Sequence, residues 1–456
     1  MNFETINPAN GERLGSYAVS TSVEVEQAIA TLHFSFTQWR DLAYADRQNF
    51  LKKLADNLTA QQEMFATLMT NEMGKPIKES RAEVKKCIQA IKSYCERDLS
   101  LLEKKSVHTI YKQSDISHEP LGVIYAIMPW NFPLWQVVRM VVPALLSGNV
   151  VLLKHSQITV QTGNEFEKLF RDVWSQPLLF HRMIAHEQTE KVMQDPRVQG
   201  ISLTGSTRAG ISAASAAALS LKKYVLELGG SDAYIVLEDA PLAAAAKALA
   251  KGRLLNTGQS CICVKRCLVH SSKQNELIEL LKKEFESFKF GNPLDDKTDL
   301  GSLAHPKFKE ALKKQLLELT ENTSAKNVYR KAHGQSEKSA FVDAEIYLLK
   351  ENSPWLAEQE FFAPILLVIP FQTDEQAIEI ANSSIFGLGG GVWSADLARA
   401  QKVASAMIAG QVAINDVIKS DVSLPFGGFK KSGVGREMGD AGLFEFTQTK
   451  VISSSL

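Results

Sequence analysis

One cysteine in this sequence stands where it could act as a nucleophile. Cys261 ends the short polar segment Asn256-Thr-Gly-Gln-Ser-Cys261, and an apolar and basic run follows it. Small neighbours let a substrate reach the sulfur, and exposed backbone N–H groups can stabilise charge on a reacting oxygen. Two other interpretations stay open from these residues alone. Cys261 could be an ordinary packing cysteine, or it could bind a metal with Cys263, Cys267 and His270, although their spacing lacks the two separated C-x2-C pairs of a structural zinc site.

A glycine-bearing turn is the second place where chemistry could occur. Thr204-Gly205-Ser206 follows a short apolar run and leads into an Ala- and Ser-rich stretch with helical composition. Such a turn lets a phosphate approach the backbone and face the positive end of the helix dipole. The turn does not match the G-x-G-x-x-G pattern, so a tight structural turn explains these residues equally well.

Alternating strands and helices must position these residues. Strands are expected at Val123–Met128, Val150–Leu153, the stretch around Arg182–Ile184, Ile201–Leu203 and Tyr224–Leu226. This alternation is typical of a parallel sheet that helices cover on both faces. A second alternating region runs from Ala233 to about Phe426. It has expected strands at Cys267–His270 and Ile365–Ile369, and expected helices at Gln274–Phe288, Glu375–Asn382 and Asp396–Ala409.

The N-terminal hundred or so residues read as amphipathic helices. Thr21–Glu24 is a capping box that opens the first helix, and Gly74-Lys-Pro76 ends the third. Ser80–Glu83 has the same capping pattern and predicts the start of a fourth helix. We find no residues in this stretch to which the sequence assigns chemistry.

Length and composition limit the class of protein. A chain of 456 residues is expected to form two or three domains. Lys plus Arg and Asp plus Glu both number 51, which gives no net charge to attract nucleic acid or an anionic membrane. The N-terminus lacks the pattern of a signal peptide, and five cysteines do not form a disulfide framework. We therefore expect a cytoplasmic protein.

Six motifs together resemble the aldehyde dehydrogenase superfamily, in that family's order and with its separations. They are Pro129-Trp-Asn131-Phe-Pro133, Gly205-Ser206 with Gly210, Glu227-Leu-Gly-Gly230, Gly258-Gln-Ser-Cys261, Glu360-Phe-Phe362-Ala-Pro364 and the run from Pro425 to Glu437. The resemblance covers essentially the whole chain. It implies an α/β, aldehyde-dehydrogenase-like fold with a Rossmann-type cofactor domain, an α/β catalytic domain and a small β bridging element.

The resemblance also implies where these parts lie. Residues 1–104 and 119–228 would form the dinucleotide-binding domain, and residues 229–434 the catalytic domain. Residues 105–118 and 435–456 would form the bridging, or oligomerisation, element. Exposed strand edges in this element would pair across a subunit interface, so we expect a homodimer or a homotetramer.

For the chemistry, the resemblance implies that the Cys261 thiolate attacks an aldehyde carbonyl. The Asn131 amide and the Cys261 backbone N–H would stabilise the oxyanion. The tetrahedral adduct would lose hydride to C4 of a nicotinamide and leave a thioester, and Glu227 would activate the water that hydrolyses it. From the residues alone, Asn131 could be a turn residue and Glu227 a surface carboxylate at a strand end. Gly229 and Gly230 favour the functional interpretation of Glu227, because they permit close approach of a ligand.

For the cofactor, the resemblance assigns Lys154 to the adenosine ribose, Trp130 and the Gly205-Ser206 turn to the pyrophosphate side, and Glu360 with Phe362 to the nicotinamide ribose and ring. Gln157 bears on the choice between NADP and NAD. A carboxylate at this position would bond the ribose 2′-hydroxyl and repel a 2′-phosphate, whereas neutral Gln157 beside Lys154 should tolerate the phosphate. We therefore expect NADP or NAD, with NADP favoured, and no metal.

Within the superfamily, two segments look most like succinate-semialdehyde dehydrogenases: Glu227-Leu-Gly-Gly-Ser-Asp232 and the run from Asn131 to Arg139. Arg139 and Ser420 match two positions that bind the substrate carboxylate in that family. A third position, an arginine in the family, is Leu255 here, and Arg253 is two residues out of register. A buried structural arginine and an ordinary loop serine are the alternatives for Arg139 and Ser420.

Three further possibilities remain at this stage. Relatives in this family carry a cysteine at the position of Cys263, and there it can form a reversible disulfide with the catalytic cysteine. The resemblance therefore makes Cys263 a possible redox partner of Cys261. Simple packing is the alternative for Cys263. The substrate could instead be another aliphatic aldehyde or semialdehyde. Finally, the chain could be a CoA-acylating relative, or a non-catalytic structural protein with the same fold.

Overall fold

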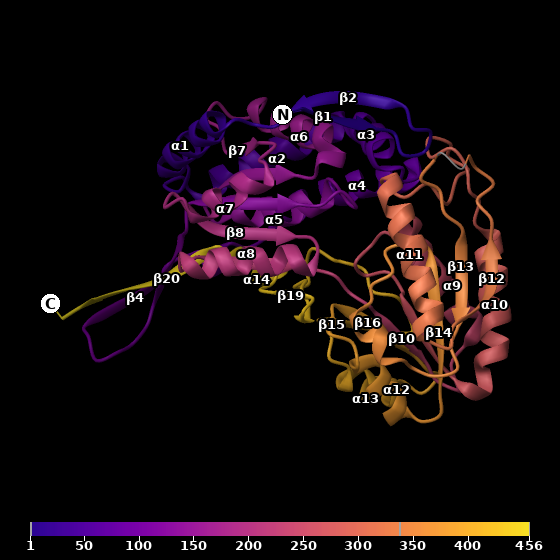
Figure 1. Cartoon of the computed structure of the whole chain (residues 1–456). Helices are drawn as coiled ribbons and strands as arrows, with labels where there is room; N and C mark the ends of the chain where they lie inside the picture. The colour runs from indigo at the N-terminus through magenta and orange to yellow at the C-terminus, as the bar shows by residue number, and fades with distance from the viewer. Residues whose placement is uncertain (1, 337–338, 456) are drawn as a thin grey trace.

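A computed structural model describes residues 2–336 and 339–455 (Figure 1). Its first sheet has the order β19-β9-β8-β5-β6-β7. The members are β5 (Val123–Met128), β6 (Val150–His155), β7 (Leu179–His181), β8 (Val198–Thr204), β9 (Lys223–Glu227) and β19 (Gly433–Val434). All pairs are parallel except that of β9 with β19. Continuous apolar runs form these strands because helices cover both faces of the sheet.

The predicted strands of this sheet are confirmed, except one. The strand expected around Arg182–Ile184 lies at Leu179–His181 instead. In this strand Leu179, Phe180 and His181 pair with Val151, Leu152 and Leu153 of β6. The predicted Ile184 lies beyond the end of the strand. The error arose because Leu179-Phe180 and Met183-Ile184 are both short apolar pairs, and register against β6 decided between them.

Helices cover the first sheet. They are α1 (Ser22–Trp39), α2 (Tyr44–Ala60), α3 (Gln62–Met73), α4 (Ile77–Glu96), α5 (Trp135–Leu146), α6 (Val160–Arg171), α7 (His186–Gln194) and α8 (Thr207–Leu219), with the hairpin β1 (Asn2–Ile6) and β2 (Arg13–Ala18) before them. The capping box of α1 is present, and Gly74 ends α3 in the left-handed conformation at φ 75°. The capping role predicted for Ser80 is wrong, because α4 begins at Ile77, directly after Pro76. Proline is tolerated at a helix start, where a backbone N–H has no intrahelical partner. The Ser80 hydroxyl instead forms a hydrogen bond with the Thr70 hydroxyl.

The second sheet has the order β12-β13-β14-β11-β10-β16-β17. Its strands are β10 (Ala233–Val236), β11 (Arg266–His270), β12 (Lys326–Lys331), β13 (Ala344–Leu348), β14 (Ile365–Phe371), β16 (Gly389–Trp393) and β17 (Gln411–Ile414). The helices are α9 (Leu242–Leu254), α10 (Gln274–Ser287), α11 (Pro306–Asn322), α12 (Asp374–Asn382) and α13 (Leu397–Ala406). Helix α13 ends at Ala406, three residues before the predicted end at Ala409. The extended backbone of Met407 ends the helix before β17.

The remaining strands and one short helix complete the fold. β3 (Lys105–Ser106), β4 (Gln113–Pro120) and β20 (Thr447–Ser454) form a third, antiparallel sheet, which projects as an arm from the body (Figure 1). β15 (Phe386–Gly387) pairs with β18 (Phe429–Lys430), and α14 (Gly439–Phe444) precedes the arm. Among the described residues, no helix is both long and apolar enough to cross a membrane.

Candidate active site

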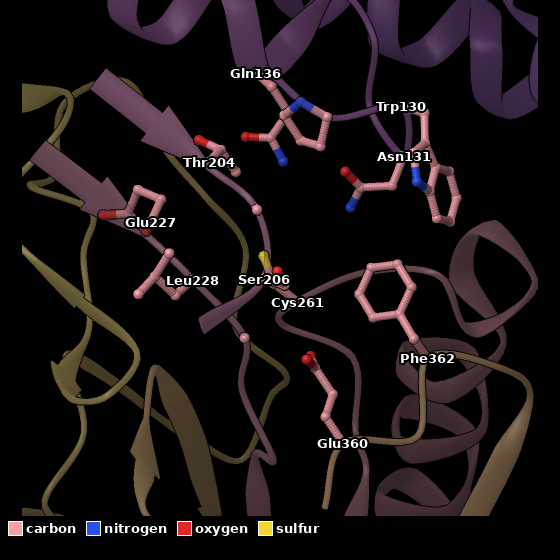
Figure 2. A pocket seen from close by; sticks show the side chains of 13 residues that line it. Trp130, Asn131, Gln136, Thr204, Ser206, Glu227, Leu228, Cys261, Glu360 and Phe362 are labelled. Atoms are coloured by element: carbon pink, nitrogen blue, oxygen red, sulfur yellow. The ribbon is translucent and has the colours of Figure 1, made fainter. Parts of the chain in front are cut away.

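The predicted catalytic residues and five of the predicted cofactor residues, Trp130, Gly205, Ser206, Glu360 and Phe362, line one cavity (Figure 2). The carboxyl ends of parallel strands lie at one edge of a sheet, and loops from that edge commonly bind ligands. Here the loops after β5, β8 and β9 meet the segment that leads into β11. The cavity measures about 210 Å³, and its lining includes Trp130, Asn131, Gly205, Ser206, Glu227, Cys261, Glu360 and Phe362. We call it the first cavity.

A tight left-handed loop presents Cys261 to this cavity. Asn256 and Thr257 have φ angles of 51° and 52°, and Gly258 has φ 78°. A side chain on Gly258 would place its Cβ 2.3 Å from the carbonyl oxygen of Ala363, so only glycine fits here. Non-glycine residues in this region cost about 1–3 kcal/mol each and persist only where packing imposes them. The loop thus holds the half-buried sulfur of Cys261 in a defined position.

Hydrogen bonds join this loop to the loop that carries Asn131. The Asn256 side-chain amide donates to the Asn131 carbonyl oxygen at 2.6 Å. The Asn131 side-chain nitrogen donates in turn to the Gln259 carbonyl oxygen at 3.2 Å, which leaves its second hydrogen for another acceptor. Glu79 accepts from the Asn256 backbone N–H at 2.9 Å. The Asn131 amide is therefore fixed relative to the segment that ends in Cys261.

Glu227 is a buried carboxylate without a partner. It is the last residue of β9 and is 2% exposed. Neither of its oxygens has a hydrogen-bond partner among the residues that the structure describes. Burial raises the pKa of Glu227 well above its usual value. Native proteins rarely leave a buried polar group unbonded, so an unpartnered carboxyl lining a cavity indicates a functional group.

Burial also raises the pKa of Cys261, to about 12, although the positive charges of Arg139 and Lys265 oppose this shift. The Lys265 ammonium donates to the Cys261 carbonyl oxygen and to the Glu360 carboxylate. At neutral pH the sulfur therefore rests as a thiol, and its proton must leave when the sulfur attacks. Glu227 and Glu360 both line this cavity. Lys265 holds the Glu360 carboxylate, whereas the Glu227 carboxyl has no hydrogen-bond partner among the described residues.

The predicted cofactor residues divide into two groups. Ser206 caps α8, accepting from the Ala209 N–H at 3.3 Å, and so lies at a helix N-terminus that favours phosphate. Trp130 contacts Phe362 edge-on at 5.8 Å between ring centroids, and Glu360 accepts from the Gly230 N–H at 3.0 Å. These groups line the first cavity, and they suit a dinucleotide with an anionic pyrophosphate.

Lys154 and Gln157 do not line the first cavity. Lys154 lies in β6, paired in register with Ile127 of β5, and burial lowers its pKa. Gln157 begins the next turn and is exposed. Both stand at the same sheet edge as Trp130, one strand further along, which is where the other end of an extended dinucleotide would reach.

A second cavity of about 230 Å³ shares Cys261 and Gln136 with the first. Both predicted substrate residues line it. Arg139 is 2% exposed, forms an ion pair with Glu437 and lies 4.8 Å from the centre of the Phe426 ring. Ser420 is half-buried and accepts a hydrogen bond from Lys86.

The residues that depart from the family pattern also have defined places. Leu255 lines the second cavity and is 36% exposed. Arg253 does not line it; this guanidinium is buried and donates to the carbonyl oxygens of Gly258, at 2.6 Å, and of Val264 and Phe361. Arg253 therefore supports the catalytic loop and does not replace the arginine that Leu255 lacks.

Cys263 is 1% exposed, and its sulfur lies 3.6 Å from the Leu255 carbonyl oxygen. Its packing is well defined, and a disulfide with Cys261 stays a prediction. Cys267 is buried within β11. Over the two ranges that the structure describes, no group of three potential metal ligands gathers.

Sequence reasoning missed several residues that line the second cavity, chiefly those of α4. Glu79, Ala82, Glu83 and Lys86 all line it. Their spacing of i, i+3, i+4 and i+7 places them on one face of the helix, and three of the four are charged. Trp135 and Gln136 were likewise not assigned, although Trp135 lies one turn before Arg139 on α5. A charged stripe on a helix normally faces solvent, so this pattern alone did not indicate a site.

Comparison with known proteins agrees with this geometry. The model of the aldehyde dehydrogenase family matches residues 1–452. The chain is 39% identical to the probable succinate-semialdehyde dehydrogenase (NADP(+)) of Synechocystis sp., covering 99% of both chains. It is 37% identical to the succinate-semialdehyde dehydrogenase (NADP(+)) of Deinococcus radiodurans, covering 99% of this chain and 94% of the other.

A solved structure agrees in fold as well. The succinic semialdehyde dehydrogenase from Streptococcus pyogenes, in complex with NADP+, superposes with a TM-score of 0.94 at 33% identity, covering 99% of each chain. The predicted α/β fold and the resemblance drawn from the six motifs are confirmed. The chain therefore belongs to the aldehyde dehydrogenase family.

Proposed function

We propose that this enzyme oxidises succinate semialdehyde to succinate with NADP. The observation that carries the chemistry is the first cavity, where the sulfur of Cys261, the held amide of Asn131 and the unpartnered carboxyl of Glu227 meet. The relatives in Synechocystis sp. and Deinococcus radiodurans, with names that give this substrate and NADP(+), support the finer assignment.

Each of the three residues has a defined part in this proposal. The Cys261 thiol releases its proton to solvent, and its sulfur forms a bond to the aldehyde carbon. The C=O π pair moves to the oxygen, which becomes anionic. The free hydrogen of the Asn131 amide and the Cys261 backbone N–H donate to that oxygen. When bound, the dinucleotide supplies the acceptor for the hydride that leaves the adduct. Glu227 then takes a proton from the water that cleaves the thioester, which releases the acid and restores the thiol.

The residues around the first cavity fit a dinucleotide. Ser206 at the start of α8 and Trp130 would hold the pyrophosphate side, with Gly205 giving it room. Glu360 and Phe362 would contact the nicotinamide ribose and ring, while Lys154 would bond the adenosine ribose. Exposed, neutral Gln157 leaves space for a 2′-phosphate, which supports NADP over NAD.

The second cavity supports a substrate with a carboxylate at its far end. It opens from the same sulfur, and Arg139 and Ser420 line it. The direct experiment is a panel of aldehydes with and without a terminal acid, assayed with both dinucleotides. The proposal expects the highest kcat/KM for succinate semialdehyde with NADP. A higher kcat/KM with NAD, or with an uncharged aldehyde, would overturn the corresponding part of it.

Two rival functions are distinguished by the product. A CoA-acylating relative would release an acyl-CoA, whereas buried Glu227 in the first cavity favours water as the acyl acceptor. We expect succinate as product with or without CoA. A non-catalytic role is opposed by Asn131, Glu227 and Cys261 standing together in one cavity.

We further propose the domain division given above and a homodimer or homotetramer. The arm supports an assembly: Val451 and Ile452 of β20 are 61% and 57% exposed, which is unusual for apolar residues of a strand that stays uncovered. Sedimentation of the purified protein tests this. The cytoplasmic location stays a prediction.

A further inference from the structure

The second cavity contains a cation that neither the motifs nor the family resemblance assigns. Lys86 lies on α4, and its side chain is half-buried at the cavity wall. The Lys86 ammonium stands 4.1 Å from the centre of the Trp135 ring and donates to the Ser420 hydroxyl. An aromatic face and a neutral hydroxyl orient an ammonium but do not neutralise it.

The other cations of this cavity are already paired. Arg139 is buried against Glu437, and Lys419 forms an ion pair with Asp416. In the described parts of the chain, no carboxylate forms an ion pair with Lys86. Glu83 is held by Lys75 and by the backbone N–H groups of Leu134 and Trp135, and Glu79 accepts from the Asn256 N–H. Glu83 and Asp421 act on the Lys86 ammonium only through longer-range attraction. The charge of Lys86 is therefore available to a ligand.

The electrostatics of the site favour an anion beside Lys86. Burial lowers the pKa of Lys86 to about 8, which means that its surroundings disfavour the charged form. A carboxylate placed against the ammonium would offset that cost and gain a charge-assisted hydrogen bond. The walls nearby, including Phe132, Trp135, Leu255 and Ile262, are apolar and suit the methylene chain of a short substrate.

We propose that Lys86, together with the Ser420 hydroxyl, binds the terminal carboxylate of the substrate. This inference rests on the proposed function and refines it. Lys86 supplies from α4 the cation that Leu255 does not supply from the catalytic loop. Arg139 then contributes positive electrostatic potential to the second cavity, while its guanidinium stays in the ion pair with Glu437.

The test compares Lys86→Met, which removes the charge and keeps the length, with Lys86→Arg, which keeps the charge. Lys85→Met is the matched control, since Lys85 is the preceding residue of α4 and is exposed. The substrates are succinate and glutarate semialdehydes and the uncharged butanal and pentanal. We expect Lys86→Met to raise KM for succinate semialdehyde roughly ten- to hundredfold, the size of one hydrogen bond to a charged group, with KM for butanal within about twofold.

We expect Lys86→Arg to retain most of the affinity and Lys85→Met to match the wild type. Equal changes for charged and uncharged aldehydes in Lys86→Met, or no change for either, would overturn the inference. Thermal melting identifies a variant that has lost its fold, and Lys86→Gln, a neutral donor, then takes its place with the same expectation. If the wild type prefers glutarate semialdehyde and Lys86→Met loses that preference, the assignment of Lys86 holds while succinate semialdehyde as the substrate fails.

Discussion

The two cavities that meet at Cys261 are built in different ways. Backbone turns at the ends of parallel strands make the first cavity, and several of its groups lie in short loops such as Gly205-Ser206 and Glu227–Gly230. Faces of α4 and α5, with the segment around Ser420, make the second. Cys261 and Gln136 are common to both.

In the proposed function, separate parts of this fold carry out bond-making and substrate choice. The first cavity contains an unpartnered carboxyl and a held amide, which are groups for a reaction. The second contains aromatic rings, a buried ion pair and an unpaired ammonium, which are groups for recognition. Changes in the first should therefore lower kcat for every aldehyde, and changes in the second should act on KM and on stability.

The largest effect is expected at the sulfur itself. Cys261→Ala removes the only nucleophile of the first cavity that the proposal uses, so oxidation of both succinate semialdehyde and butanal should fall by at least about a thousandfold. Dinucleotide binding, followed by quenching of protein fluorescence, should be retained. Residual turnover close to the wild type would show that another group carries the acyl transfer.

The next effect concerns the ion pair of the second cavity. Arg139→Met leaves buried Glu437 without its partner, and breaking a buried pair in this way costs about 3–5 kcal/mol of unfolding free energy. Urea denaturation should detect this loss. The double variant Arg139→Met with Glu437→Gln should recover most of it, because no unpaired charge remains. Unchanged stability in the single variant would mean that the pair has no structural role.

The smallest effect is expected at the adenosine end, outside both cavities. Gln157→Glu places a carboxylate near the expected 2′-phosphate of NADP, and we expect KM for NADP to rise roughly tenfold while KM for NAD stays level or falls. Steady-state kinetics with each dinucleotide measures the ratio. A proportional change for both would argue against Gln157 as a contact of the 2′-phosphate.

Sequence reasoning reached the first cavity more fully than the second for a physical reason. A strand end and the glycine turn after it are consecutive in sequence. The motifs alone therefore predicted that Glu227 and Ser206 lie at strand ends. The second cavity depends on which face of α4 turns inward, and tertiary packing decides that. Lys86 and Glu83 look like solvated helix residues until α5 is packed against them. The same limit explains Ser80, whose capping pattern was overridden by Pro76 one turn earlier.

A trapped acyl-enzyme would identify the residue that forms the covalent intermediate. The Glu227→Gln enzyme is mixed with succinate semialdehyde and NADP, quenched in acid, and its intact and peptide masses are determined. Because the variant lacks the base for hydrolysis, the account predicts one succinyl group per chain, attached as a thioester at Cys261 and absent when Cys261 is also changed to Ser. An unmodified Cys261, or an acyl group on any other residue, would contradict the account.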